Sequence, residues 1–154
     1  MAVYKEPFSA STRGDQFRNL AAYRNGRPHR GQDWAPGANK IIPAITAGKV
    51  IANEWSDALG WTITQSTTDG LFGLYAHLAD QPKLSIGHVL KIGDPIGKVG
   101  STGTSTTGPH LHLSIAKSKN VSLCIFEKLV DPLIQFVNSD SVKASQAKKV
   151  VSKK

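Results

Sequence analysis

The pattern of polar and apolar positions changes near residue 40. Residues 1–40 are rich in turn-forming residues and arginine, which predicts mostly loops with short strands. β-branched residues then surround a predicted turn at Gly48, and polar and apolar residues alternate over 60–66, GWTITQS. Such alternation is typical of a strand with one face against a core. Asp69-Gly70 gives a hairpin signal, and we expect the next strand, GLYAHL, to return directly after it.

The second half of the chain continues the same pattern. Short apolar runs over 82–103 lie between Gly and Gly-Asp-Pro turns, and 110–116, HLHLSIA, predicts the last strand. Turns every 8–12 residues favour an all-β core. Asp131 and Pro132 suit the N-cap and first position of a short C-terminal helix. We therefore expect a mainly β fold, a small antiparallel sheet domain, over residues 1–137.

Composition and charge narrow the possible partners. The chain has 154 residues and one cysteine, which suits a single domain without an internal disulfide. Its net charge is +8, and residues 138–154 hold five lysines and one acidic residue. We expect this basic tail to be disordered and to favour anionic partners such as a cell wall or membrane surface. The tryptophans are scattered, so we expect no specific nucleic-acid binding.

Two histidines in the last predicted strand are candidates for metal or catalytic chemistry. In a strand, side chains two positions apart point to the same side, so His110 and His112 would project together while Leu111 faces the core. A pair alone is weak evidence, because single strand histidines are common at surfaces. From the residues alone, either imidazole could be the metal ligand.

A second group lies in RPHRGQDW, which contains His29 and Asp33. If this segment is extended, positions four apart share a face, and Gly31 between them leaves room for a bulky group. Two histidines and a carboxylate form a ligand set of catalytic zinc sites. His77 in the strand GLYAHL could contact a developing oxyanion. We interpret His88 beside a turn as incidental.

Taken together, these motifs resemble one family. RPHRGQDW, IIPAITAGKV, YAHL, IGHVLKIGDPIGKVGSTG and TGPHLHLSI occur in the order and rough spacing of the M23 zinc metallopeptidases, the lysostaphin/LytM-type peptidoglycan endopeptidases. The resemblance covers about residues 8–135. It implies a narrow groove that holds one zinc ion. It implies His29, Asp33 and His112 as zinc ligands, and His77 and His110 as catalytic histidines that activate water and stabilise the tetrahedral intermediate.

The resemblance also implies the substrate, a peptide bond in the stem or cross-bridge of bacterial peptidoglycan. The alternative is an inactive wall- or partner-binding module of the amidase-activator type. Inactive members typically lose site residues, whereas this chain keeps all five candidate positions, which favours an enzyme. The sequence differs from the usual family motif at two places near the site. STTGPHLH has one extra threonine, and Ser114 stands where the family often has an acidic residue.

The N-terminus has no basic region followed by an apolar core, so we expect no secretory signal. A wall hydrolase of this kind fits a bacteriophage lysis protein, made in the host cytoplasm and acting on the wall, or one carried in the virion. We expect a monomer, because no long apolar surface stretch is evident.

Overall fold

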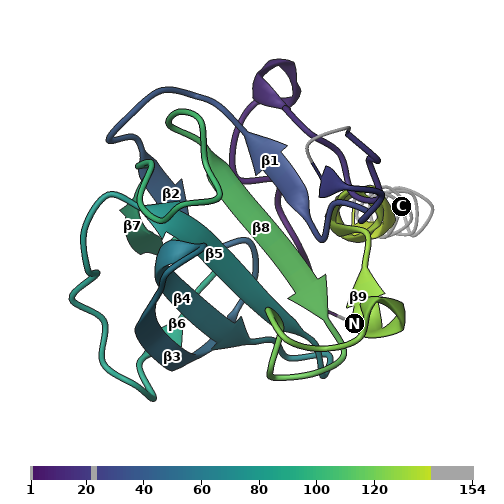
Figure 1. The fold of residues 1–154 in the computed structure, drawn as a ribbon. Helices are drawn as coiled ribbons and strands as arrows, with labels where there is room; N and C mark the ends of the chain where they lie inside the picture. Colours follow the sequence, from purple (N-terminus) through teal and green to yellow (C-terminus); the bar gives the residue numbers. More distant parts are fainter. Residues whose placement is uncertain (1, 22–23, 140–154) are drawn as a thin grey trace.

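A computed structural model describes residues 2–21 and 24–139 of the chain. Seven strands form one curled antiparallel sheet, and two more form a separate antiparallel pair, β2 with β7 (Figure 1). The strands are β1 (Gln32–Trp34), β2 (Ile41–Pro43), β3 (Gly48–Ser56), β4 (Gly60–Ser66), β5 (Phe72–Leu78), β6 (Val89–Leu90), β7 (Pro95–Lys98), β8 (Leu111–Ala116) and β9 (Leu129–Val130). The described residues also include the short 3-10 helices η1 (Ala10–Thr12) and η3 (Phe126–Lys128).

The predicted mainly β fold is confirmed, and so is the hairpin at Asp69-Gly70. It joins β4 to β5 through a loop that is closed by a hydrogen bond from the Thr67 amide to the Leu71 carbonyl. The predicted turn at Gly48 is wrong, because the chain bends over 45–47 and Gly48 is the first residue of β3. A Cβ atom at Gly48 would lie 1.7 Å from the Ser66 carbonyl oxygen, so this glycine permits a close backbone approach.

The sheet order β1-β8-β5-β4-β3-β6 places β8 and β5 at its centre. One face of this region forms the main core, with Leu111 and Leu113 of β8 fully buried beside Tyr75 of β5. Leu111 therefore faces the core as predicted. The opposite face carries His112 and Ser114 of β8. Alternation along the strand thus separates packing residues from candidate site residues.

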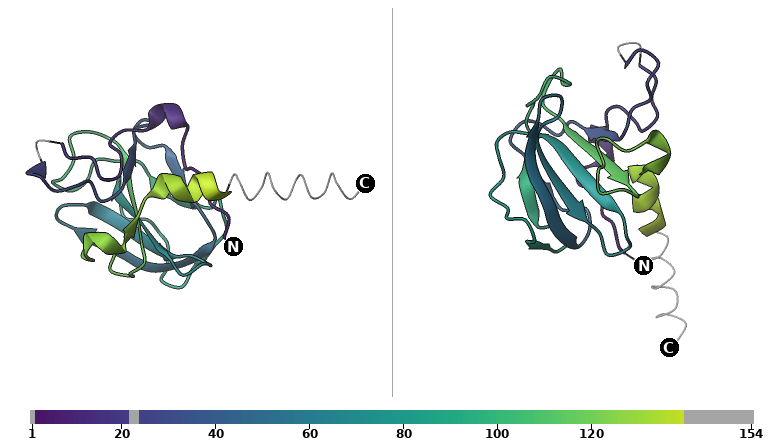
Figure 2. Two further views of the ribbon diagram at one scale, coloured as in Figure 1. Left: turned by 90° about the vertical axis from the view of Figure 1, so that its right-hand side faces the viewer. Right: turned by 60° about the horizontal axis from the view of Figure 1, so that its bottom comes forward.

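A C-terminal helix over residues 132–139 packs against the core face. Asp131 caps it as predicted, since its Oδ1 atom accepts the Leu133 amide at 3.0 Å. Phe136 packs edge-on against Trp34 of β1, with ring centroids 6.1 Å apart, and Figure 2 shows the helix from two further sides.

The helix includes the first two positions of the predicted tail, and 140–154 lie outside the described residues. No helix in the described parts of the chain has the length and hydrophobicity of a membrane span.

Candidate metal and catalytic site

The register between β1 and β8 builds the centre of the site. Asp33 lies directly opposite His112 in this antiparallel pair, and Ala76 of β5 lies opposite His112 on its other side. Directly opposed residues of a sheet project from the same face. The carboxylate therefore reaches the imidazole across one strand spacing, without any loop rearrangement.

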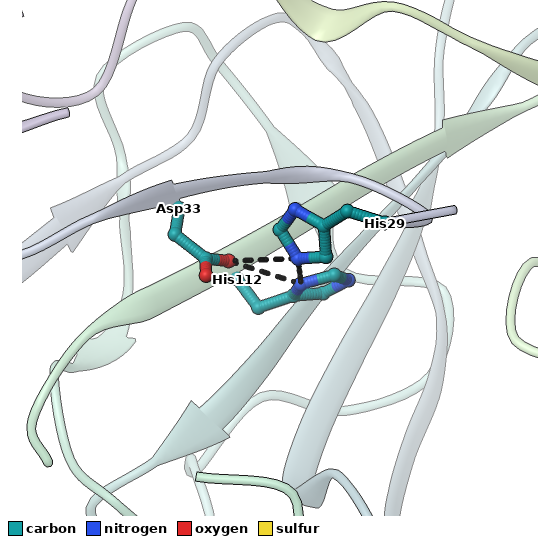
Figure 3. A group of neighbouring side chains, drawn as sticks. All are labelled: His29, Asp33 and His112. Carbon is teal, nitrogen blue, oxygen red and sulfur yellow. Dashed lines mark hydrogen bonds and ion pairs between the residues drawn. The ribbon is translucent and has the colours of Figure 1, made fainter. Parts of the chain in front are cut away.

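Three side-chain atoms converge at this point (Figure 3). The Nε2 atom of His29 lies 3.1 Å from Nδ1 of His112, and the Oδ1 atom of Asp33 lies 3.1 Å from that same Nδ1 atom. The third side of the triangle, from His29 Nε2 to Asp33 Oδ1, measures 3.3 Å. Both histidines are buried.

The outer nitrogens of the two imidazoles are held by acceptors. His29 Nδ1 donates to the Gln16 carbonyl at 3.1 Å. His112 Nε2 lies 2.8 Å from the Ser114 hydroxyl, which itself donates to the Arg30 carbonyl at 3.0 Å. A carbonyl can only accept, so this network assigns the protons to the outer nitrogens. The inner nitrogens of His29 and His112 then each present a lone pair to the other and to the Asp33 carboxylate.

With both imidazoles neutral, three lone pairs meet at this point, and that arrangement is favourable only around a cation. The separations also fit a metal ion, because tetrahedral zinc bonds of about 2.0–2.1 Å place neighbouring ligand atoms about 3.3 Å apart. His29, Asp33 and His112 are a group of metal-ligand type in the described residues. The donor chemistry and the spacing therefore fit a zinc ion with three protein ligands.

The local electrostatics support the ionised form of the carboxylate. Burial raises the pKa of Asp33, but hydrogen bonds and charge interactions with His112 and His29 outweigh burial and hold this pKa below its ordinary value. Burial lowers the pKa of His112, and it outweighs the opposing effect of Asp33. A negative Asp33 carboxylate and a neutral His112 imidazole are the ligand states that zinc requires.

His77 enters the site through a β-bulge. Ala76 and His77 of β5 lie opposite the single residue Thr62 of β4, and His77 has a left-handed φ of 61°. Regular alternation would turn His77 to the core face with Tyr75, so the bulge re-aims its side chain into the groove. Its Nδ1 atom donates to the Thr102 carbonyl at 2.7 Å. Burial is the largest of the effects that lower the pKa of His77 to about 4.

His110 directly precedes β8 and faces His77. Their ring centroids lie 4.7 Å apart, and His110 Nε2 lies 3.8 Å from Oδ2 of Asp33. The Nδ1 atom of His110 donates to the Gly108 carbonyl at 2.9 Å, while the Thr106 hydroxyl donates to that same carbonyl. The threonine-rich loop thus fixes this ring as well. Both rings line the groove, and in the described part of the chain no backbone carbonyl engages the Nε2 atom of either ring.

These side chains lie in a groove of about 970 Å³. Its floor comes from β8 and β5, and its walls come from the segment before β1 and from the loop between β7 and β8. Figure 1 shows these two segments on opposite sides of β8. Thr104 to Gly108 line the second wall, so the loop that carries the extra threonine borders the groove.

Comparisons with known proteins identify the family. A model described as "Peptidase family M23" matches residues 27–123, well over half of the chain. The chain belongs to peptidase family M23. The resemblance found in the sequence is therefore confirmed at the level of the family.

Two curated relatives of this M23 chain are staphylococcal enzymes. It is 37% identical to lysostaphin of Staphylococcus simulans over 90 residues, which cover 57% of this chain and 18% of lysostaphin. It is 36% identical to the glycyl-glycine endopeptidase ALE-1 of Staphylococcus capitis over 90 residues, or 57% of this chain and 24% of that enzyme. The matched region thus spans less than a quarter of either relative.

Solved structures of peptidases share the fold. The catalytic domain of lysostaphin from Staphylococcus simulans gives a TM-score of 0.70 at 28% identity, covering 86% of this chain and 92% of that domain. A zinc-containing peptidase from Vibrio cholerae gives a TM-score of 0.69 at 25% identity, and the match covers 86% of this chain and 39% of that peptidase. The catalytic domain of the prophage-encoded M23 protein EnpA from Enterococcus faecalis gives a TM-score of 0.67 at 29% identity. This match covers 81% of this chain and 92% of that domain.

The structure brings together all five site residues that the M23 resemblance indicated. His29, Asp33 and His112 form the triangle, and His77 and His110 lie beside it. His88 lies apart from them, exposed at a turn.

The explanation of Gly31 as room for a bulky group is wrong. A Cβ atom there would lie 2.2 Å from the Leu113 carbonyl oxygen and 2.9 Å from Ser114 Oγ, so the absent side chain accommodates β8 itself. Sequence reasoning also missed what Ser114 does. The presence of Ser114 where the family often has an acidic residue was a clue to this role. A hydroxyl at this position can accept a hydrogen bond from His112, as a carboxylate would.

Proposed function

We propose that this protein is a zinc-dependent endopeptidase that hydrolyses a peptide bond in the stem or cross-bridge of bacterial peptidoglycan. The observation that carries the proposal is the convergence of three lone-pair atoms from His29, Asp33 and His112 beside two further histidines in an open groove. The family and the similarity to lysostaphin support the choice of substrate.

A zinc ion held by His29, Asp33 and His112 would act as a Lewis acid toward the scissile carbonyl. The chain's own contribution comes from His77 and His110. Each ring is oriented by an Nδ1–H bond to a backbone carbonyl, so each Nε2 atom faces the groove with a lone pair. One Nε2 atom accepts a proton from the attacking water, and a protonated Nε2 atom donates to the oxyanion of the tetrahedral intermediate.

Digestion of purified peptidoglycans tests this function. Walls with direct cross-links and walls with glycine bridges are incubated with the full chain, with and without a chelator, and products are read by mass spectrometry. We expect new amine termini at a peptide cross-link, lost with chelator and restored by zinc. His88→Ala removes an exposed histidine outside the site and should match the unmodified protein. Zinc-loaded protein that binds walls without releasing products would instead support the amidase-activator type of module.

We also propose a bacteriophage role, in lysis of the host from its cytoplasm or as a component of the virion. The support is the fold similarity to the catalytic domain of a prophage-encoded M23 protein. Antibody detection in infected cultures tests it: the protein in lysates only at lysis supports a lysis enzyme, and its presence in purified virions supports the second role. Constant levels in uninfected cells would contradict both.

We further propose that the basic tail adds electrostatic attraction to the anionic wall or membrane. All five lysines after position 137 lie within 140–154. Deletion of 140–154 keeps the described helix and should weaken wall binding at low salt more than at high salt. Unchanged binding at low salt would contradict this role.

A further inference from the structure

Charge is distributed unequally between the two walls of the groove. The segment before β1 contributes three arginines to the lining, Arg24, Arg27 and Arg30. The facing wall, from the β3–β4 turn and the loop between β7 and β8, contributes small, hydroxyl and apolar side chains and, among the described residues, no charged lining residue. The groove therefore has one basic wall and one neutral wall.

Two of the three arginines have structural partners. Arg24 pairs with Asp15 at 2.7 Å. Arg30 donates through Nη2 to the carbonyls of Val121 and Cys124 at 3.1 and 2.8 Å, and so ties down the loop after β8. The acidic residues among the described lining are Asp15, paired with Arg24, and Asp33, in the metal triangle. Neither carboxylate offsets the third arginine.

That third arginine, Arg27, is exposed and forms no ion pair with another described residue. A turn holds its backbone, closed by a hydrogen bond from the Arg27 amide to the Arg24 carbonyl. His29 follows two positions later, so at most about 7 Å of chain separates the two residues. A guanidinium at this position can reach a group beside the scissile bond.

We propose that Arg27 forms a subsite for a free carboxylate on the substrate residue next to the scissile bond. The inference rests on the proposed endopeptidase function and specifies its substrate class. A planar guanidinium binds a carboxylate through two parallel hydrogen bonds, which gives both affinity and orientation. The neutral wall opposite then receives the uncharged side of the peptide, so the pair of walls sets the direction in which the substrate lies.

A carboxylate subsite at Arg27 would make glycine bridges poor substrates for this protein. One relative is named as a glycyl-glycine endopeptidase, and a run of glycines has no side-chain carboxylate for Arg27 to bind. A peptide cross-link formed through a dicarboxylic diamino acid does offer one. We therefore expect this protein to prefer cross-links with a free carboxylate beside the cleaved bond over glycine bridges.

The test uses two cross-linked muropeptides that are identical except at one group. In one, the diamino-acid carboxylate next to the scissile bond is free, and in the other it is the carboxamide. For the full chain we expect kcat/KM to be about tenfold higher on the free acid, mainly through KM. Arg27→Gln should lose this preference, so that acid and carboxamide are cleaved with equal kcat/KM, and Arg27→Lys should keep part of it.

Lys83→Gln is the matched control, because it removes one exposed positive charge from outside the groove lining. It should keep the preference of the unmodified protein. Equal cleavage of acid and amide by the unmodified protein, or a preference that survives in Arg27→Gln, overturns the carboxylate subsite. If the unmodified protein cleaves neither muropeptide and no pentaglycine peptide, the proposed endopeptidase function is overturned instead. The two failures are therefore distinguishable.

Discussion

The Ser114 hydroxyl lies 2.8 Å from Nε2 of His112 and joins this imidazole to the backbone carbonyl of Arg30. All three groups are buried or half-buried at the floor of the groove. A neutral hydroxyl here orients the metal-site histidine without adding negative charge. The hydroxyl thus fixes which nitrogen of His112 faces Asp33.

Ser114→Ala should weaken zinc binding about 10- to 100-fold, the usual effect of losing a hydrogen-bond partner of a metal ligand. The substitution leaves the Nε2 proton of His112 buried without an acceptor and frees the ring to rotate. Competition with a chromogenic chelator measures the zinc Kd. Ser122→Ala, at an exposed groove residue, is the control, and equal zinc affinity for both variants would contradict the orienting role.

Alanine substitutions should separate two kinds of site residue. His29→Ala, Asp33→Ala and His112→Ala should each lose both zinc and activity. His77→Ala and His110→Ala should retain zinc and lose about 10²- to 10⁴-fold in turnover, the contribution typical of a positioned acid or base. Metal content after dialysis, with peptidoglycan digestion alongside, distinguishes the groups. A metal-free His77→Ala or His110→Ala protein would show that the roles are divided incorrectly.

The metal-free protein should lose stability as the pH falls from about 6.5 to about 4. The pKa of His77 is lowered from 6.5 to about 4, mainly by burial. In this pH window the unfolded chain therefore binds a proton that the folded chain does not. The free energy of unfolding should therefore fall by about 3 kcal/mol as the pH is lowered across this window. Urea unfolding in the presence of chelator at pH 7, 5.5 and 4.5 measures the change.

His77→Asn is the control for this prediction. Asparagine tolerates the left-handed backbone at this position and does not titrate, so the variant should show a shallower pH dependence. An equally steep loss of stability in the variant would assign the effect to other groups.

Gly31→Ala should destabilise the fold by about 2–4 kcal/mol, because its methyl group would meet the Leu113 carbonyl oxygen at 2.2 Å. Gly108→Ala adds a methyl group in the groove lining that meets nothing within 4 Å, so it should be close to neutral. Thermal unfolding of both variants gives the comparison. Similar melting temperatures would mean that β8 can move away from Gly31 at little cost.

Much of the sheet could be predicted because its strands carry local signals. The alternation over 60–66 corresponds to β4, and the Asp69-Gly70 turn fixed the next pairing. The helix cap at Asp131 also followed from the sequence, since capping depends on a few neighbouring residues.

The rest depended on contacts between distant segments. The pairing of Asp33 with His112 is a register, and a single chain offers no signal for which residues of two strands lie opposite each other. The bulge that re-aims His77 arises from one extra residue relative to β4, which the alternation of β5 does not reveal. Gly31 was misread for the same reason, since its neighbour belongs to a strand far along the chain.

The metal triangle connects segments that are 83 positions apart. β1, which supplies one corner, is a three-residue strand at the edge of the sheet, and the single cysteine excludes an internal disulfide. A bound ion would therefore serve as the chain's reversible cross-link, closing a long loop that no covalent bond closes. Such an ion binds the folded state alone and adds to its stability in proportion to the logarithm of free metal. Resistance to unfolding would then report the zinc supply of the compartment in which the protein folds.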